Sequence, residues 1–249
     1  MGRVECKVAI VTGGASGLGW ADAELLVAEG ARVVITDVNA KDGAALAERL
    51  GPNALFLEQD VRDEERWKQV IAETVRHFGR LDVLVNNAGV VVVATPEETT
   101  LEQFRFANAV MSEGVFLGCK HAIPAMRESG GGSIINMSSI ASHLGYPVFF
   151  AYSAAKGAVR AMTKSVAVHC QANGYGIRCN SIHPGAVETP MIRQAEGRQE
   201  AQDVPDGVLP INSVGAPKDV ANLVLYLASD ESRFVNGAEF VLDNGLSIQ

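Results

Sequence analysis

Short apolar runs rich in β-branched residues alternate along the chain with longer segments of helical character. A run such as Lys7–Thr12 (KVAIVT) is typical of a strand that is buried on both faces. Strands that are separated by helices pair in parallel, so we predict one α/β domain with a doubly wound parallel sheet and helices on both faces. The predicted strands, about seven in number, are Lys7–Thr12, Arg32–Asp37, Ala54–Glu58, Leu81–Asn86, Ser133–Met137, Ile177–Ile182 and Ala238–Asp243.

The predicted helices run to about Glu29 after the first strand and then cover Lys41–Leu50, Asp63–Phe78, Leu101–Met126 with an interruption near Pro124, Ala151–Ala172 and Pro217–Ala228. One segment, 186–216, is long, polar and irregular. A loop of this length in a compact domain is usually functional or mobile. We expect it to be a lid over a site, and a surface insertion without function is the alternative. No change in composition divides residues 1–249, which favours a single domain.

Composition and charge narrow the classes of partner. The chain of 249 residues is 47% hydrophobic and 20% charged, as is ordinary for a globular protein. Its formal net charge of −8 argues against nucleic acid or an anionic membrane surface as a partner. Its four cysteines form no CxxC pair and are expected to be reduced. The first residues lack the pattern of a signal peptide and the apolar runs are too short to span a bilayer, so we expect a cytoplasmic protein.

A glycine-rich turn, TGGASGLG, follows the first predicted strand and precedes a helix. Glycines in this place let the backbone approach a pyrophosphate, which then lies at the helix N-terminus. The turn therefore favours a dinucleotide site over a plain turn. Its residues are Gly13, Ser16, Gly17, Leu18 and Gly19.

Asp37 ends the second predicted strand, close to the roughly 20-residue offset at which an acidic residue meets the adenosine ribose. Its carboxylate would accept from the 2′-hydroxyl and repel a 2′-phosphate. No Arg or Lys lies within the glycine turn or at Val38 and Asn39 to bind such a phosphate. We therefore predict NAD rather than NADP as the cofactor, and a turn-capping Asp is the alternative.

Tyr152 and Lys156 lie four residues apart in a predicted helix and therefore on the same face. A phenol has a pKa of about 10, and a cation a few ångströms away favours the phenolate and lowers that pKa. The pair is a candidate acid/base, and Ser139 could orient a substrate oxygen beside it. The alternative for the pair is a solvated helix face.

Other polar residues lie where ligands or metals could bind. Asp60-Val61 and the block NNAG, which includes Asn87 and Gly89, follow the third and fourth strands, where ligands bind in parallel sheets. The five histidines show no HxxxH spacing and do not cluster with cysteines in the sequence, so no metal site is predicted. Ser139 lacks the GxSxG elbow of a hydrolase, and His183 is expected to be a structural loop residue.

Together, TGGASGLG, NNAG, Ser139 thirteen residues before Tyr152, YSAAK and SIHPGAVETP resemble the short-chain dehydrogenase/reductase family, from Lys7 to Gly245. The resemblance implies one Rossmann domain, commonly a homotetramer, that transfers a hydride to or from nicotinamide. It implies that Tyr152 exchanges a proton with the substrate oxygen and that Ser139 holds that oxygen. Lys156 would lower the pKa of Tyr152 and bind the nicotinamide ribose.

By the same resemblance, Asp60 and Val61 would flank the adenine and Asn87 the adenosine side of the cofactor. Pro184, Val187 and Thr189 would position the nicotinamide.

Met111 departs from the family pattern, because it stands in VMSEGVFLG where the family usually has Asn. In the family this Asn supports a water in the proton relay from the lysine, and Met has no comparable donor or acceptor. The Met111 carbonyl could still hold the water, or Asn108 one turn earlier could substitute. Ser213 stands where the family often has Arg, which puts subunit or loop contacts in doubt rather than the chemistry.

The predicted substrate pocket is apolar, which favours a bulky, lipophilic secondary alcohol or ketone. Three segments resemble bacterial hydroxysteroid and cyclic-alcohol dehydrogenases, namely INMSSIAS, GYGIRCNSIHP and the ending LASDESRFVNGAEFVLDNG. A steroid or cyclic terpenoid alcohol is therefore expected. A 3-oxoacyl-carrier-protein reductase is the alternative, which Asp37 and the negative net charge disfavour. A non-catalytic NAD(H)-binding protein is a third reading, which only Met111 favours. The predicted pocket residues are Val91, Ile140, Phe149 and Met191.

Overall fold

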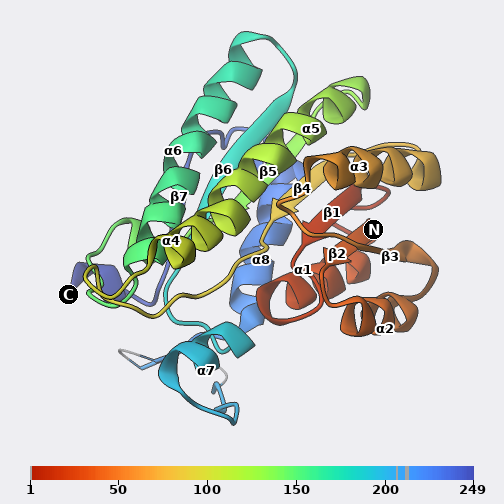
Figure 1. The fold of residues 1–249 in the computed structure, drawn as a ribbon. Helices are drawn as coiled ribbons and strands as arrows, with labels where there is room; N and C mark the ends of the chain where they lie inside the picture. Colours follow the sequence, from red (N-terminus) through yellow and green to blue (C-terminus); the bar gives the residue numbers. More distant parts are fainter. Residues whose placement is uncertain (1, 206, 211–212) are drawn as a thin grey trace.

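The computed structural model describes residues 2–205, 207–210 and 213–249. Among them, seven parallel strands form one sheet in the order β3-β2-β1-β4-β5-β6-β7 (Figure 1). This confirms the predicted doubly wound sheet in a single α/β domain. The strands are β1 Val8–Thr12, β2 Arg32–Asp37, β3 Ala54–Glu58, β4 Val83–Asn86, β5 Gly132–Met137, β6 Ile177–Pro184 and β7 Glu239–Leu242.

Helices cover both faces of the sheet (Figure 1). One buried core lies between the sheet and α3, α5 and α6, and the other lies between the sheet and α1, α2 and α8. The helices are α1 Gly17–Ala28, α2 Ala40–Leu50, α3 Glu64–Phe78, α4 Leu101–Asn108, α5 Gly114–Glu128, α6 Phe150–Ala172, α7 Pro190–Glu196 and α8 Pro217–Ala228. Across the described residues, each helix is either too short or not apolar enough to cross a membrane.

Strand β1 shows why the sheet is buried on both faces. All five of its residues are buried. Val8 and Ile10 join the core under α3 and α5, whereas Ala9 and Val11 join the core under α1 and α8. Strand β1 also lies between β2 and β4, where the order of the sheet reverses. Connections leave this point in opposite directions and open a crevice at the carboxyl ends of the strands, where ligands bind in such sheets.

The predicted long helix 101–126 is divided in the structure, but not at Pro124. A π-helical turn at Ala109–Glu113 separates α4 from α5, and Pro124 lies inside α5. A single π turn adds a residue to the helix and is often found near functional sites. Directly after it, a side chain on Gly114 would place its Cβ 2.9 Å from Val61 Cγ2. The glycine therefore lets the start of α5 pack closely against Val61, in the loop between β3 and α3.

The segment 186–216 is less irregular than predicted, because it contains α7. Thr189 caps this helix by accepting a hydrogen bond from the Ile192 backbone N–H at 3.3 Å, and Pro190 occupies its first turn. Gly197 ends it in a left-handed conformation at φ +67°. Part of the predicted lid, residues 206 and 211–212, lies outside the described residues.

Candidate functional site

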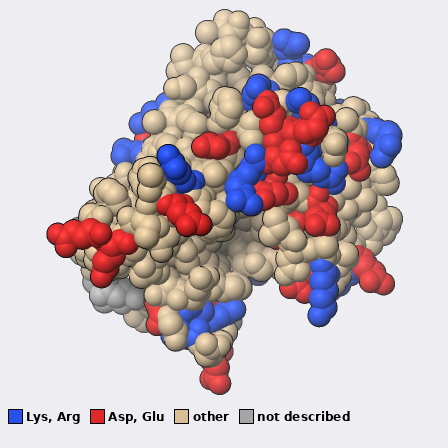
Figure 2. All heavy atoms as spheres, in the orientation of Figure 1, with Lys and Arg blue, Asp and Glu red and all other residues tan. Residues whose placement is uncertain are grey.

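A cleft of about 560 Å³ opens at the carboxyl ends of the strands. Figure 2 shows the molecule hollowed between its main body and the segment around α7. Of the predicted site residues, all of which lie in the described part of the chain, Gly19 and Met111 lie outside its lining. The predicted residues that line it are Gly13, Ser16, Gly17, Leu18, Asp37, Asp60, Val61, Asn87, Gly89, Val91, Ser139, Ile140, Phe149, Tyr152, Lys156, Pro184, Val187, Thr189 and Met191.

The glycine turn is shaped to admit a ligand at the N-terminus of α1. Gly13 and Gly17 have left-handed backbones, with φ of +63° and +56°. Gly19 lies behind the turn, where a Cβ would approach within 2.4 Å of the Gly13 carbonyl oxygen and 2.6 Å of Asn87 Nδ2. Asn87 Nδ2 also donates to the carbonyls of Thr12 and Gly13. The exposed N–H groups at this helix end suit the pyrophosphate of a dinucleotide.

Asp37 is fixed at the end of β2 by the backbone. Its two carboxylate oxygens accept from the N–H groups of Ala15 at 3.0 Å and Asn39 at 2.9 Å. The carboxylate therefore faces the glycine turn within the cleft, where the adenosine ribose is expected.

Arg62 is a cation in the cleft that the sequence reasoning overlooked. Its Nε donates to Asp60 Oδ1 at 2.9 Å. This hydrogen bond lowers the pKa of Asp60. The Asp60 carboxylate is thus paired with Arg62, and its place beside the adenine stays a prediction.

Ser139, Tyr152 and Lys156 converge where β5 ends and α6 begins. Ser139 caps the short turn after β5, and its Oγ accepts from the Ala141 N–H at 3.1 Å. Burial raises the pKa of Tyr152, and a hydrogen bond from Ser139 opposes that rise. Burial also lowers the pKa of Lys156 to about 8. The site therefore holds a protonated phenol at neutral pH, with Ser139 beside its oxygen.

Lys156 was expected to lower the pKa of Tyr152, but in the structure that pKa is raised. Lys156 Nζ donates to the Met137 carbonyl at 2.7 Å and lies 5.6 Å from the centre of the Tyr152 ring. The ammonium is therefore held by the end of β5 and not by the phenol oxygen, and burial dominates the Tyr152 pKa.

Met111 is fully buried and lies in the π turn between α4 and α5. It packs with Ala107 and Ala151, in a cluster that also contacts Tyr152. Asn108 donates to the Phe104 carbonyl at 2.9 Å, so its amide is committed to its own helix. This geometry argues against Asn108 as a substitute for the family Asn.

Replacing Met111 by Asn should maintain or raise kcat if the side chain at this position limits proton transfer. The buried amide would at the same time lower the free energy of unfolding by about 1–3 kcal/mol, because its surroundings are apolar. Steady-state kinetics and urea unfolding would measure both effects, with Met111→Leu as an apolar control. A large loss of turnover at unchanged stability would instead show that the site is built around Met.

Several residues that were not predicted also line the cleft, among them Tyr146, Ile192, Ala195 and Leu246. Tyr146 comes from the loop before α6, Ile192 and Ala195 from α7, and Leu246 from the C-terminal turn Leu246–Ile248. For α7 a signal was present, since Thr189-Pro190 matches a helix cap followed by proline. Leu246 reaches the cleft only through the tertiary fold.

A group that could hold a metal was also missed, because its residues are distant in sequence. His143, His183 and Glu239 each offer a ligand atom, and these atoms lie within 4.8 Å of one another. However, Glu239 already forms ion pairs with Arg160, at 2.9 Å, and with Lys164. Two cations on one carboxylate offset the charge that would attract a metal ion. Charge therefore disfavours a metal at this position.

Comparisons with known proteins extend over the whole chain. A family model described as enoyl-(acyl carrier protein) reductase matches residues 13–247. The chain is 43% identical to the NADP-dependent (R)-specific alcohol dehydrogenase of Lentilactobacillus kefiri, over 99% of each chain. It is 42% identical to the 3-beta-hydroxysteroid dehydrogenase of Comamonas testosteroni, over 98% of this chain and 97% of the relative. It is 40% identical to the cyclopentanol dehydrogenase of Comamonas sp. (strain NCIMB 9872), over 98% of each chain.

Proposed function

This chain belongs to the short-chain dehydrogenase/reductase family, and from that premise we propose that it is an NAD-dependent enzyme that interconverts a lipophilic cyclic secondary alcohol and its ketone. The general activity, that of an alcohol/ketone oxidoreductase with a nicotinamide dinucleotide cofactor, follows from the family and from its dehydrogenase relatives. The proposal rests on one observation above all. Ser139, Tyr152 and Lys156 meet in the same cleft as the glycine turn.

The residues of the cleft fit the cofactor. The glycine turn and the N-terminus of α1 would hold the pyrophosphate, and Asp37 would accept from the adenosine ribose. Val61, Asn87 and Gly89 would border the adenosine half, and Pro184, Val187 and Thr189 the nicotinamide half. When bound, the nicotinamide supplies or accepts the hydride.

In ketone reduction, the Tyr152 hydroxyl would donate its proton to the carbonyl oxygen, and Ser139 would hold that oxygen by a second hydrogen bond. The raised pKa of Tyr152 keeps the phenol protonated and ready to donate. Lys156 would stabilise the phenolate that remains, because its charge lies one helical turn away. Alcohol oxidation would use the same groups in reverse.

Asp37→Ala should narrow the preference for NAD over NADP by about tenfold to a hundredfold in kcat/KM, because a carboxylate beside a 2′-phosphate costs several kcal/mol. Asp37→Asn is the matched control, since it removes the charge but retains an oxygen that can accept from the Ala15 or Asn39 N–H. Initial rates with both cofactors would measure the ratio. The same ratio in the wild type and in Asp37→Ala would leave Asp37 as a turn residue only.

The walls of the substrate end of the cleft support an apolar ring as the substrate. Val91, Ile140, Phe149 and Met191 line it, and Ile192 and Leu246 add further apolar surface. We also propose that 186–216 acts as a lid, because α7 contributes Met191 and Ile192 to the lining. Glu188 anchors this helix through ion pairs with Arg193, at 2.8 Å, and Arg198, at 2.9 Å. A homo-oligomer, as the family implies, stays a prediction that light scattering would test.

Formation of reduced cofactor from a panel of alcohols would test the proposal. The panel contains cyclopentanol, cyclohexanol, a monoterpenoid alcohol, hydroxysteroids and a 3-hydroxyacyl thioester, each with NAD and with NADP. We expect turnover of cyclic alcohols with NAD. Turnover of the thioester alone would favour a 3-oxoacyl-carrier-protein reductase, the second candidate, which shares only the acyl carrier protein with the description of the matching family model. Cofactor binding without turnover would favour a non-catalytic protein.

A further inference from the structure

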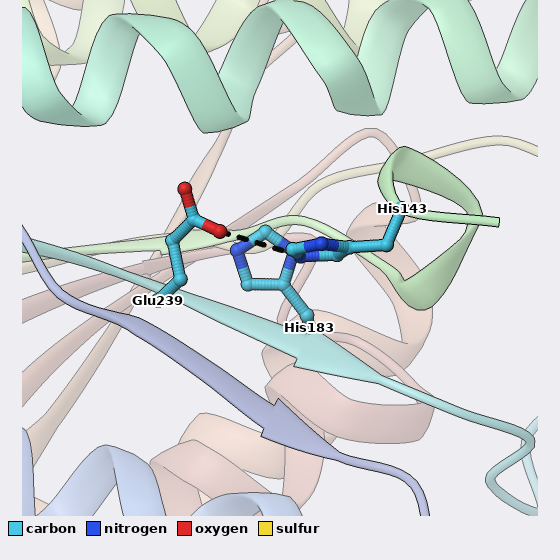
Figure 3. Close-up of side chains that lie close together, drawn as sticks. All are labelled: His143, His183 and Glu239. Carbon is cyan, nitrogen blue, oxygen red and sulfur yellow. Dashed lines mark hydrogen bonds and ion pairs between the residues drawn. The ribbon is translucent and has the colours of Figure 1, made fainter. Parts of the chain in front are cut away.

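The His143–His183–Glu239 cluster lies directly behind Ser139. Figure 3 shows the three side chains converging from the loop after β5, from β6 and from β7. His183 is fully buried and belongs to β6 rather than to a loop as predicted. Its Nδ1 lies 3.2 Å from the Ser139 carbonyl oxygen, 2.9 Å from Ser142 Oγ and 3.0 Å from His143 Nε2.

The hydrogen-bond partners assign the proton of His183 to Nδ1. The Ser139 carbonyl can only accept, and Ser142 Oγ donates its single proton to that carbonyl at 2.7 Å. Ser142 Oγ is therefore left to accept from His183, which makes Nδ1 the donor towards both groups. His183 Nε2 accepts from Ser181 Oγ at 2.8 Å. Burial lowers the pKa of His183 to about 4, so the ring is neutral at ordinary pH.

Two donors, His183 and Ser142, thus hold the Ser139 carbonyl from behind. On the other side of the same residue, Ser139 Oγ accepts from the Ala141 backbone N–H. The Ser139 hydroxyl also forms the hydrogen bond that opposes the rise in the Tyr152 pKa. We propose that His183 is a positioning residue, whose Nδ1–H fixes the Ser139 backbone so that the Ser139 hydroxyl stays directed at Tyr152 and the substrate oxygen. This inference rests on the proposed function.

The outer part of the cluster connects His183 to α6, the helix that carries Tyr152. Glu239 Oε2 lies 3.5 Å from His143 Nε2 and 2.9 Å from Arg160 Nε. Arg160 also donates to the Ser142 carbonyl at 3.3 Å. The network therefore joins the Ser139 turn, β6, β7 and α6 by hydrogen bonds. A protonated Nδ1 offers no lone pair to a metal ion, which agrees with the charge balance at Glu239.

A pair of variants separates positioning from packing. His183→Leu removes the donor, whereas His183→Asn can place an amide N–H near the former Nδ1. We expect His183→Leu to lower kcat about tenfold to a hundredfold, with the Kd for NAD nearly unchanged, and His183→Asn to restore most of the loss. Steady-state kinetics, with a cyclic alcohol that the wild type oxidises, would measure kcat. A fluorescence titration would measure the Kd for NAD. Equal losses in the two variants would overturn the proposal.

A double-mutant cycle tests the route through Ser139. In a Ser139→Ala background, His183→Leu should have little further effect on the residual kcat, and an undiminished effect would contradict positioning. If His183→Leu does not fold, Ser142→Ala removes the second donor and should lower kcat in the same Ser139-dependent way. Loss of wild-type turnover in a chelator, restored by Zn²⁺, would show a metal at this cluster and overturn the proposal. Full turnover in Tyr152→Phe would instead refute the proposed function itself.

Discussion

Replacing Tyr152 by Phe should lower kcat by about 10²–10⁴-fold while the Kd for NAD stays nearly unchanged. The variant loses only the hydroxyl that would exchange a proton with the substrate. The ring would keep its contact with Phe149, whose centroid lies 6.1 Å away. Single-turnover kinetics and a cofactor titration would separate the two effects.

Tyr146→Phe provides a matched control, because Tyr146 lines the same cleft but lies apart from Lys156 in the sequence. Its turnover should stay within a few-fold of the wild type. Unchanged turnover in Tyr152→Phe, or equal losses in the two variants, would contradict the assignment of Tyr152 as the acid/base.

Lys156→Met should produce the second large effect, a loss of about a hundredfold or more in kcat. The variant removes the cation that would stabilise the Tyr152 phenolate. In the wild type, ketone reduction should fall as the pH rises through about 8, because Lys156 loses its proton there. This descending limb should be absent from the residual activity of the variant. A wild-type profile that stays flat from neutral to alkaline pH would contradict the role of Lys156.

The same substitution should cost little stability. Burial lowers the Lys156 pKa from 10.5 in the unfolded chain to about 8 in the fold. The unfolded chain therefore binds more protons between these two values, and the contribution of Lys156 to stability rises with pH through that window. Below this pH window the buried ammonium destabilises the fold. Met removes that destabilisation, although the Met137 carbonyl loses its donor. Thermal unfolding of both proteins from neutral to alkaline pH would measure the difference, and a large drop in the variant at neutral pH would contradict this account.

The features that could be predicted from the sequence are those encoded over short distances along the chain. Strand β1 is an unbroken apolar run, the glycine turn follows it directly, and Tyr152 and Lys156 are one helical turn apart. Each pattern is read within a few residues, and the order of strands and helices then places them at one edge of the sheet.

Features that depend on contacts between distant segments could not be predicted in the same way. The donor contact of Lys156 with the Met137 carbonyl, the reach of Leu246 into the cleft and the meeting of His143, His183 and Glu239 all depend on packing. The π turn at Ala109–Glu113 was missed for another reason. Its sequence is compatible with an ordinary helix, and Pro124 was the more conspicuous helix breaker.

The reversal of strand order between β1 and β4 divides the cleft between two halves of the sheet. Asp37 lies on the half formed by β1, β2 and β3, whereas the segment that carries Met191 follows β6 on the other half. Substitutions at one end of the cleft leave the scaffold of the other end in place. If the two ends hold cofactor and substrate as proposed, we expect cofactor preference and substrate preference to be separable traits, each open to change by selection or engineering while the other is retained.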